Sequence, residues 1–226
     1  PHVVNQIIRE ALHPYPDNLT IVTKIGYRRD EQGAWLPAST VAELNQAVHD
    51  NLRNLSLDTL AVVNLRVGES NGMRGDTSLA ERFSALLELQ RKGLVQHIGL
   101  SNVTAKQIAE ARAMGEIVCV QNMYNVAQRH DDAMIADLAK HNIAYVPFFP
   151  LGGFSPLQSS ELDDAAKSLN ATPMQLALAW LLHHAPNILL IPGTSSVAHL
   201  RENIAAADLE IPPDMKAKLD GIGVTA

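Results

Sequence analysis

The sequence has little cysteine, no long apolar run and no excess of positive charge. One cysteine, Cys119, lies in an apolar stretch of the 226 residues, which excludes an internal disulfide and predicts a reducing, cytoplasmic compartment. No apolar run approaches the roughly 18 residues that span a bilayer, so no membrane association is expected. The net charge of −6 gives no indication of binding to nucleic acid.

Several catalytic motifs are absent as well. The sequence has no glycine fingerprint of a Rossmann fold, no P-loop, no serine-hydrolase elbow and no zinc-protease helix motif. His183 and His184 are adjacent, so their side chains diverge on a helix and do not easily share a metal. His130–Asp132 is interpreted as a loop cluster with an Asp helix cap. The sequence therefore predicts no metal site.

What the chain does contain is a regular alternation of strands and helices. Short runs rich in Val, Ile and Leu alternate with helical patterns of about 12 residues, which is typical of a parallel sheet. The expected strands are residues 19–25, 57–67, 95–100, 117–120, 143–149 and 188–191. No hairpin, internal repeat or linker is predicted, so residues 1–226 are expected to form a single domain.

This alternation fits an open doubly wound sheet or a (β/α)8 TIM barrel that lacks its first one or two strands. Polar and cationic residues decide between them, because they fall at or just past the carboxyl ends of successive strands, where barrel enzymes build their sites. These residues are Lys24, Arg66, Ser101–Asn102, Gln121–Asn122, Phe148 and Gly193–Thr194. Their placement favours the barrel.

The stretch Ile188–Ser196 predicts an anion site. Four apolar residues form a short buried strand, Pro192–Gly193 ends it, and three hydroxyl side chains follow where a helix begins. Free N–H groups and the helix dipole point at this turn, and His199 adds positive charge one helical turn later. The alternative is an ordinary turn with Ser and Thr helix caps.

Other candidate residues lie at strand ends. In the strand 61–67, Val63, Leu65 and Val67 take one face and Asn64 and Arg66 the other. Arg66 and Lys24 then either face a substrate carbonyl, or Arg66 pairs with a carboxylate at the rim. Amide and hydroxyl side chains after two adjacent strands could together hydrogen-bond a ring that bears an amide, and an aromatic side chain could stack on such a ring. Taken one at a time, the polar residues fit helix caps or turns and the aromatic residue fits the core. They are Ser101, Asn102, Gln121 and Phe148.

Taken together, five stretches in order make the chain similar to the aldo-keto reductase family, and nearest to its bacterial branch that contains pyridoxal reductases. The stretches are Val22–Lys24, Gly99–Asn102, Val120–Asn125, Phe149–Gly153 and Ile191–Ser196 with His199–Leu200 and Glu202–Asn203. The resemblance covers essentially the whole chain. It implies a (β/α)8 barrel that binds NADPH and transfers hydride to a small-molecule carbonyl, such as pyridoxal or another small aromatic aldehyde.

The resemblance also implies roles for individual residues. Ser101, Asn102 and Gln121 would bind the nicotinamide carboxamide, and Phe148 would take the place of the stacking aromatic. The rest of the cofactor-binding set is Pro150, Leu151, Gly152, Gly193, Thr194, Ser195, His199 and Asn203. The family commonly has Lys and Arg where Gly193 and His199 stand.

The family's proton donor is a tyrosine assisted by a lysine, an aspartate and usually a histidine. Lys24 matches the lysine, and Arg66 stands where the histidine is expected. Tyr15 and Tyr27 do not match the donor's place. The resemblance therefore predicts about 50 preceding residues in the natural protein, with two strands, the aspartate and the tyrosine. Without them the 226-residue chain is expected not to close the barrel and to lack the general acid.

Two rival functions remain open at this stage. The first is an NADP(H)-binding regulatory protein with little or no turnover, which Arg66 in place of histidine supports. The second is an unrelated barrel enzyme that acts on a phosphorylated metabolite. The expected assembly is a monomer or a weak homo-oligomer.

Overall fold

The computed structural model describes residues 3–68, 73–152 and 160–222. Gly153 of the expected cofactor motif lies outside these residues, as do residues 69–72 of the glycine-rich loop that follows Arg66. The chain divides into two compact units, Pro1–Val120 and Gln121–Ala226, and each is described by itself. Within the described ranges, no helix has the length and apolar character needed to cross a membrane.

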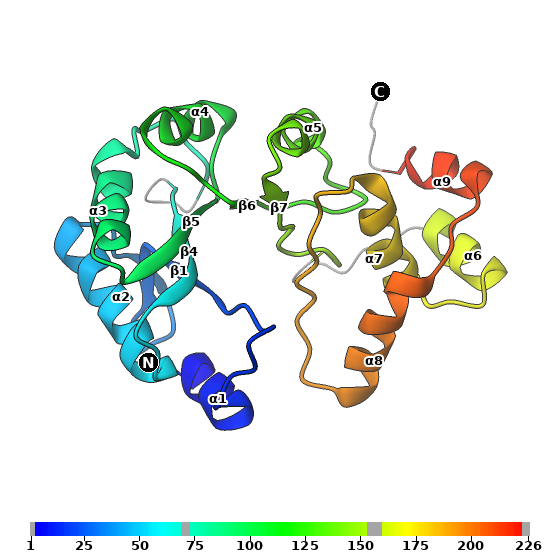
Figure 1. The fold of residues 1–226 in the computed structure, drawn as a ribbon. Coiled ribbons are helices and arrows are strands. Elements are labelled where there is room, and N and C mark those ends of the chain that lie inside the picture. The colour runs from blue at the N-terminus through cyan, green and yellow to red at the C-terminus, as the bar shows by residue number, and fades with distance from the viewer. Residues whose placement is uncertain (1–2, 69–72, 153–159, 223–226) are drawn as a thin grey trace. The chain divides into compact units, whose positions relative to one another are not determined.

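The first unit is a parallel sheet with helices packed on it. Strands β1 (Val22–Ile25), β4 (Leu60–Arg66) and β5 (Val95–Ser101) are neighbours in that order, and β6 (Cys119–Gln121) follows β5 in the sheet. The helices of this unit are α1 (Val3–Leu12), α2 (Val41–Leu55), α3 (Ala80–Arg91) and α4 (Ala105–Met114). Helices α2 and α3 lie along one side of these strands (Figure 1).

The alternation predicted for β4 is present, and both of its faces are largely buried. Val63 and Leu65 are fully buried, and Asn64 is 1% exposed. The buried Oδ1 of Asn64 accepts a hydrogen bond from Cys119 Sγ at 3.1 Å. Gly99 on the neighbouring strand leaves room for this contact, since a Cβ there would overlap both Asn64 Oδ1 and Cys119 Sγ.

Three helices begin at capping boxes that are legible in the sequence. Thr40 and Glu43 form a complete capping box at the start of α2. Thr104 caps α4 in the same way. Thr172 caps α7 (Pro173–His184), with Pro173 in its first turn. Local side-chain chemistry therefore fixes where these three helices begin.

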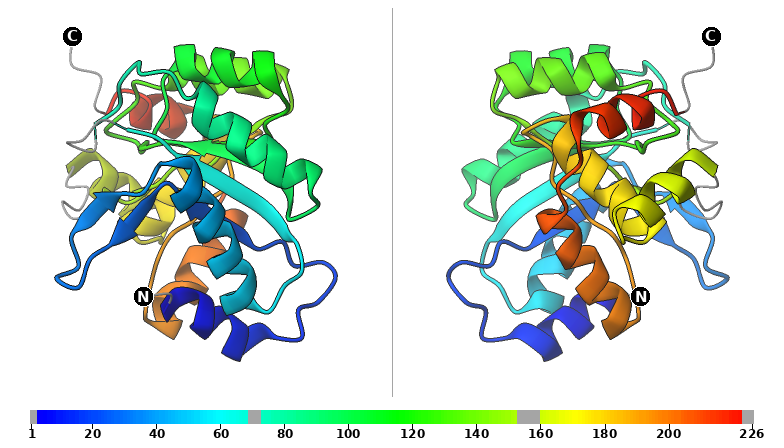
Figure 2. Two further views of the ribbon diagram at one scale, coloured as in Figure 1. Left: turned by 90° about the vertical axis from the view of Figure 1, so that its left-hand side faces the viewer. Right: turned by 90° about the vertical axis from the view of Figure 1, so that its right-hand side faces the viewer.

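The prediction of no hairpin is wrong. Within the stretch expected to be a polar loop, β2 (Tyr27–Arg29) pairs antiparallel with β3 (Trp35–Pro37), and Figure 2 shows the pair in blue. The turn closes because Asp30 Oδ1 accepts from the backbone N–H of Ala34 at 2.7 Å, and Gly33 supplies a φ of 81°. The Arg29 guanidinium also stacks 3.8 Å from the centre of the Trp35 ring across the hairpin.

The second unit packs helices around the polar segment that follows β6. Its elements are α5 (Asp132–Lys140), β7 (Ala144–Tyr145), α6 (Ser160–Ser168), α7, α8 (Val197–Ala205), the 3-10 helix η1 (Ala206–Asp208) and α9 (Pro213–Leu219). Helix α7 supplies the core, since every residue from Leu176 to Leu181 is buried and Trp180 is fully so.

Two expected strands of this unit differ from the prediction: one is shorter, and the other is only an isolated bridge. Residues 143–149 contain only the two-residue β7 and one isolated bridge, between Phe148 and Met123. Residues 188–191 are not a buried strand: Ile188 makes a single parallel bridge to Tyr145, while Leu189 is 58% and Ile191 45% exposed. Pairing ends at Leu189, whose backbone N–H donates to the carbonyl of Tyr145 at 2.9 Å.

Candidate active site and cofactor site

Lys24 and Arg66 lie at the carboxyl ends of adjacent parallel strands. Lys24 pairs in register with Asn64, and Arg66 follows two residues later, so all three side chains leave the same face of the sheet. Lys24 is exposed as a whole residue, but desolvation of its ammonium group, and then the nearby charge of Arg66, lower the pKa of Lys24 to about 8. Burial, and then the charge of Arg29, also lower the pKa of Arg66. Two cations are therefore held close together at this rim.

The hairpin supplies aromatic contacts to Arg66. Its guanidinium carbon lies 4.7 Å from the centre of the Tyr27 ring and 5.1 Å from that of Trp35. In the part of the chain that the structure describes, Arg66 therefore contacts aromatic rings, and the expected pairing with a rim carboxylate is not found. Stacking holds a planar guanidinium in a defined orientation and leaves its N–H edge for an acceptor.

Ser101 and Asn102 lie beside Arg66 at the end of the next strand. Ser101 pairs in register with Arg66, and its side chain is buried with no hydrogen-bond partner for Oγ among the described residues. Asn102 has a φ of 61° and donates from Nδ2 to the carbonyl of Val67 at 2.9 Å. The first unit therefore brings four of the predicted site residues, Lys24, Arg66, Ser101 and Asn102, to one edge of its sheet.

In the second unit, Gln121 and Phe148 lie in segments tied to each other. Gln121 ends β6 and is 7% exposed. The backbone N–H of Phe148 donates to the carbonyl of Asn122 at 2.9 Å, and the backbone N–H of Tyr124 donates to the carbonyl of Phe148. Asn125 Nδ2 donates to the carbonyl of Phe149 at 3.2 Å. Gln121 and Phe148 therefore belong to one locally connected structure.

The turn after Phe148 is compact, as its glycine suggests. Phe149 has a φ of 55° and Gly152 a φ of 88°, and the backbone N–H of Gly152 donates to the carbonyl of Phe149 at 3.0 Å. Pro150 is buried, while Leu151 and Gly152 are partly exposed. Their predicted contact with the cofactor stays a prediction.

The turn at the start of α8 combines capping with exposed polar groups. Ser196 is the N-cap and accepts from the backbone N–H of His199, while Thr194 Oγ1 accepts from the backbone N–H of Ser196 at 3.0 Å. The capping alternative is thus realised by Ser196, and the anion site stays a prediction. The predicted residues here are exposed or partly exposed: Gly193, Thr194, Ser195, His199 and Asn203.

Alternating strands and helices with polar and cationic side chains at the strand ends define an α/β enzyme that acts on a polar small molecule. The family is then shown by comparison. The profile of the aldo/keto reductase family matches residues 2–223, and the chain belongs to this family.

Individual relatives agree with this assignment. The chain is 66% identical to pyridoxine 4-dehydrogenase of Escherichia coli over 224 residues, which are 98% of this chain and 78% of that protein. A solved thermostable aldo-keto reductase in complex with epalrestat is 27% identical, with a TM-score of 0.81 over 96% of this chain and 77% of its own. An aldo-keto reductase from Klebsiella pneumoniae in complex with NADPH is 24% identical, with a TM-score of 0.78 over 96% of this chain and 74% of its own. These matches confirm the predicted (β/α)8 fold class and the resemblance to the pyridoxal reductase branch.

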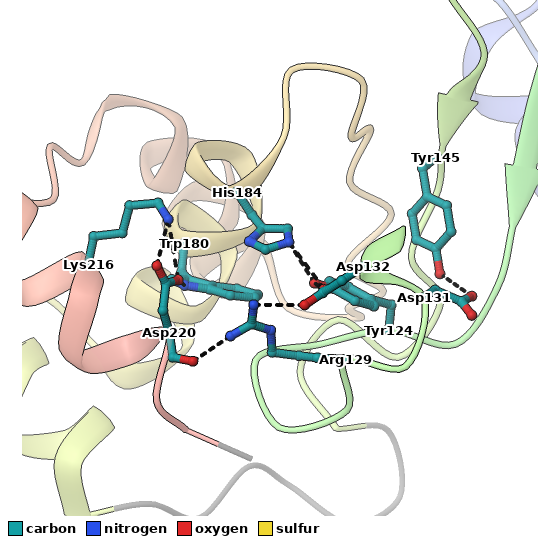
Figure 3. Close-up of polar contacts among 9 residues, drawn as sticks. All are labelled: Tyr124, Arg129, Asp131, Asp132, Tyr145, Trp180, His184, Lys216 and Asp220. Atoms are coloured by element: carbon teal, nitrogen blue, oxygen red, sulfur yellow. Dashed lines mark hydrogen bonds and ion pairs between the residues drawn. The ribbon is translucent and has the colours of Figure 1, made fainter. Parts of the chain in front are cut away.

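Sequence reasoning missed the residues that surround Arg66. Tyr27, Arg29 and Trp35 were assigned to a polar loop, although Asp30 and Gly33 between two aromatic residues are a turn signal. It also missed a polar network in the second unit, formed around the buried Tyr124 and the partly exposed Asp132 (Figure 3).

Proposed function

We propose that this protein binds NADPH and reduces an aldehyde or ketone to an alcohol, with a small aromatic aldehyde of the pyridoxal type as substrate. The observation that carries the proposal is the row of Lys24, Arg66 and Ser101 on three neighbouring strand ends. Membership of the aldo/keto reductase family and the similarity to pyridoxine 4-dehydrogenase support both the reaction and the substrate class.

The residues present fit the cofactor. A buried hydroxyl without a partner among the described residues, Ser101 Oγ, costs free energy unless a ligand bonds it, and a carboxamide offers both a donor and an acceptor. Ser101, Asn102 and Gln121 would bind that carboxamide, and Phe148 would lie against the ring. The rest of the dinucleotide would be bound by Pro150, Leu151, Gly152, Gly193, Thr194, Ser195, His199 and Asn203. The NADPH-bound Klebsiella pneumoniae structure supports the choice of cofactor.

The two cations would act on the substrate carbonyl. NADPH, when bound, supplies the hydride. Arg66, held by the Tyr27 and Trp35 rings, orients the carbonyl and stabilises the negative charge that develops on its oxygen. Lys24 lowers the pKa of the proton donor as a nearby positive charge. Arg66 itself does not exchange protons near neutral pH, so another group must protonate the alkoxide.

We place that proton donor on a tyrosine outside these 226 residues. Three tyrosine hydroxyls of the chain donate elsewhere: Tyr15 to the carbonyl of Leu55, Tyr124 to Asp132, and Tyr145 to Asp131. The fourth, Tyr27, lies with its ring against Arg66. Turnover by the 226-residue chain that equals turnover by a longer chain would contradict this assignment.

A single-turnover experiment tests the function. The protein is loaded with NADPH, an aromatic aldehyde is added, and the absorbance of reduced nicotinamide and the alcohol product are followed together. Reduction requires that both change in equal amounts, and that Lys24→Met slows them. NADPH that stays bound without oxidation would favour the regulatory alternative, and failure of NADPH to bind would overturn the proposal.

A further inference from the structure

Tyr124 is the buried centre of a polar cluster in the second unit, whose carboxylates, Asp132 and Asp220, are partly exposed. Its side chain is fully buried, and its ring packs edge-on against Tyr145, with ring centres 5.7 Å apart, and stacks over Trp180 at 6.3 Å. The hydroxyl donates a hydrogen bond to Asp132 Oδ1 and lies 2.8 Å from His184 Nε2 (Figure 3). Burial, and then the bond to Asp132, raise the pKa of Tyr124. The hydroxyl therefore stays protonated and donates a hydrogen bond to this carboxylate.

Asp132 is held in place from a second direction. Arg129 forms an ion pair with Asp132 Oδ2 at 2.9 Å, and the same guanidinium donates to the carbonyl of Asp220 at 2.5 Å. The Asp220 carboxylate in turn accepts from Trp180 Nε1 at 2.8 Å and pairs with Lys216 at 2.9 Å. The end of α9 and the indole of α7 therefore fix the acceptor that Tyr124 requires (Figure 3).

The backbone of Tyr124 connects this cluster to the proposed nicotinamide site. Gln121 lies three residues earlier on the same segment. The Tyr124 N–H donates to the carbonyl of Phe148, and the Phe148 N–H returns to the carbonyl of Asn122 at 2.9 Å. The backbone of Tyr124 is therefore part of the segment that carries Gln121 and is bonded directly to the segment that carries Phe148.

We infer that Tyr124, fixed by Asp132 and His184, is a positioning residue that holds Gln121 and Phe148 in the geometry that binds the nicotinamide ring. The inference rests on the proposed function, because it assigns those two residues to the cofactor. Binding residues need supporting contacts that fix their positions before the ligand arrives, and the partly exposed Asp132 carboxylate, which bonds both the buried Tyr124 hydroxyl and Arg129, supplies such a contact.

The test is Tyr124→Phe, which keeps the buried ring and removes only the hydroxyl. The matched control is Tyr15→Phe, which removes a hydroxyl bonded to the carbonyl of Leu55 at 2.7 Å in the first unit. Both variants lose one hydrogen bond, so both are expected to lower the melting temperature. Of these two variants, only Tyr124→Phe is expected to raise the dissociation constant for NADPH, by about 3- to 10-fold. Asp132→Asn, which changes the acceptor of the same hydrogen bond, is expected to raise it similarly.

A second readout does not depend on cofactor binding. Hydrogen exchange should become faster at residues 121–125 and 145–149 in Tyr124→Phe and stay unchanged there in Tyr15→Phe. If wild-type protein binds NADPH and Tyr124→Phe binds it within twofold of wild type, Tyr124 is only structural and the inference is wrong. If exchange at these segments is unchanged, it is also wrong. Wild-type protein that does not bind NADPH would overturn the proposed function and the inference with it.

Discussion

Lys24 and Arg66 leave the same face of neighbouring parallel strands, and the charge of Arg66 helps to bring the pKa of Lys24 down to about 8. Two cations placed together raise the free energy of the fold, and this arrangement is typical of a site that acts on an electron-rich atom. In this chain the cation–π contacts of Arg66 with the rings of Tyr27 and Trp35 offset part of this unfavourable free energy.

Lys24 should make stability depend on pH in the alkaline range. Its ordinary pKa of 10.5 falls to about 8 on folding, so between these values the unfolded chain binds more protons and stability rises with pH. We expect this rise in urea unfolding of wild type and its loss in Lys24→Met. Lys106→Met, which changes an exposed lysine on α4, is the control. An equal rise in Lys24→Met would show that another group causes it.

Arg66 should be sensitive even to conservative substitution. Arg66→Ala is expected to lower kcat/KM for aldehyde reduction roughly 100-fold, because in the proposed function Arg66 donates to the oxygen on which negative charge develops. Arg66→Lys should recover little of this, since an ammonium does not reproduce the contacts of a planar guanidinium with the Tyr27 and Trp35 rings. Trp35→Leu should have a smaller effect in the same direction. Full activity in Arg66→Lys would refute the orienting role.

Ser101→Ala should change stability and cofactor affinity in opposite directions. Removing a buried hydroxyl that has no partner in the described residues is expected to stabilise the fold by about 1 kcal/mol. The same change should weaken NADPH binding about 3- to 10-fold, because the carboxamide loses a partner. Chemical denaturation and NADPH titration measure the two effects. Ser168→Ala, whose hydroxyl donates to the carbonyl of Ala165, should leave affinity unchanged.

His184 should lower stability in acid. Burial holds its pKa below the ordinary 6.5, so below that pH the unfolded chain binds the extra proton and stability falls as pH falls. The groups that face it are Asp132, Arg129, Tyr124, Lys216 and Asp220. His184→Gln should flatten this dependence, and His183→Gln, at an exposed position whose ring contacts the carbonyl of Leu209, should not. An unchanged acid dependence in His184→Gln would contradict the assignment.

Local chemistry explains what could be predicted from the sequence. The capping boxes at Thr40, Thr104 and Thr172 need only residues three apart, so the helix starts follow from short motifs. The alternation in β4 likewise assigns Asn64 and Arg66 to one face, because side chains two apart on a strand point the same way. The divergence of His183 and His184 is also confirmed, since they contact Leu209 and Tyr124 respectively.

Contacts between distant residues explain what was missed. Strand 188–191 was expected from its apolar run, but a strand needs continuous partners and this one bridges only Tyr145. The cluster at Tyr124 joins residues 60 positions apart, which no motif spacing encodes. Asp131 stands at the N-cap position of α5 as the expected Asp cap, but its carboxylate makes no capping bond and accepts from the Tyr145 hydroxyl at 2.8 Å. Tertiary packing decides such cases.

The central claim is that these strand-end side chains bind a nicotinamide dinucleotide. Calorimetric titration of the purified protein with NADPH tests it most directly, with Gln121→Ala as the comparison. We expect saturable binding at one site per chain, weakened about 10-fold by Gln121→Ala. No saturable binding, or equal binding by Gln121→Ala, would contradict the account.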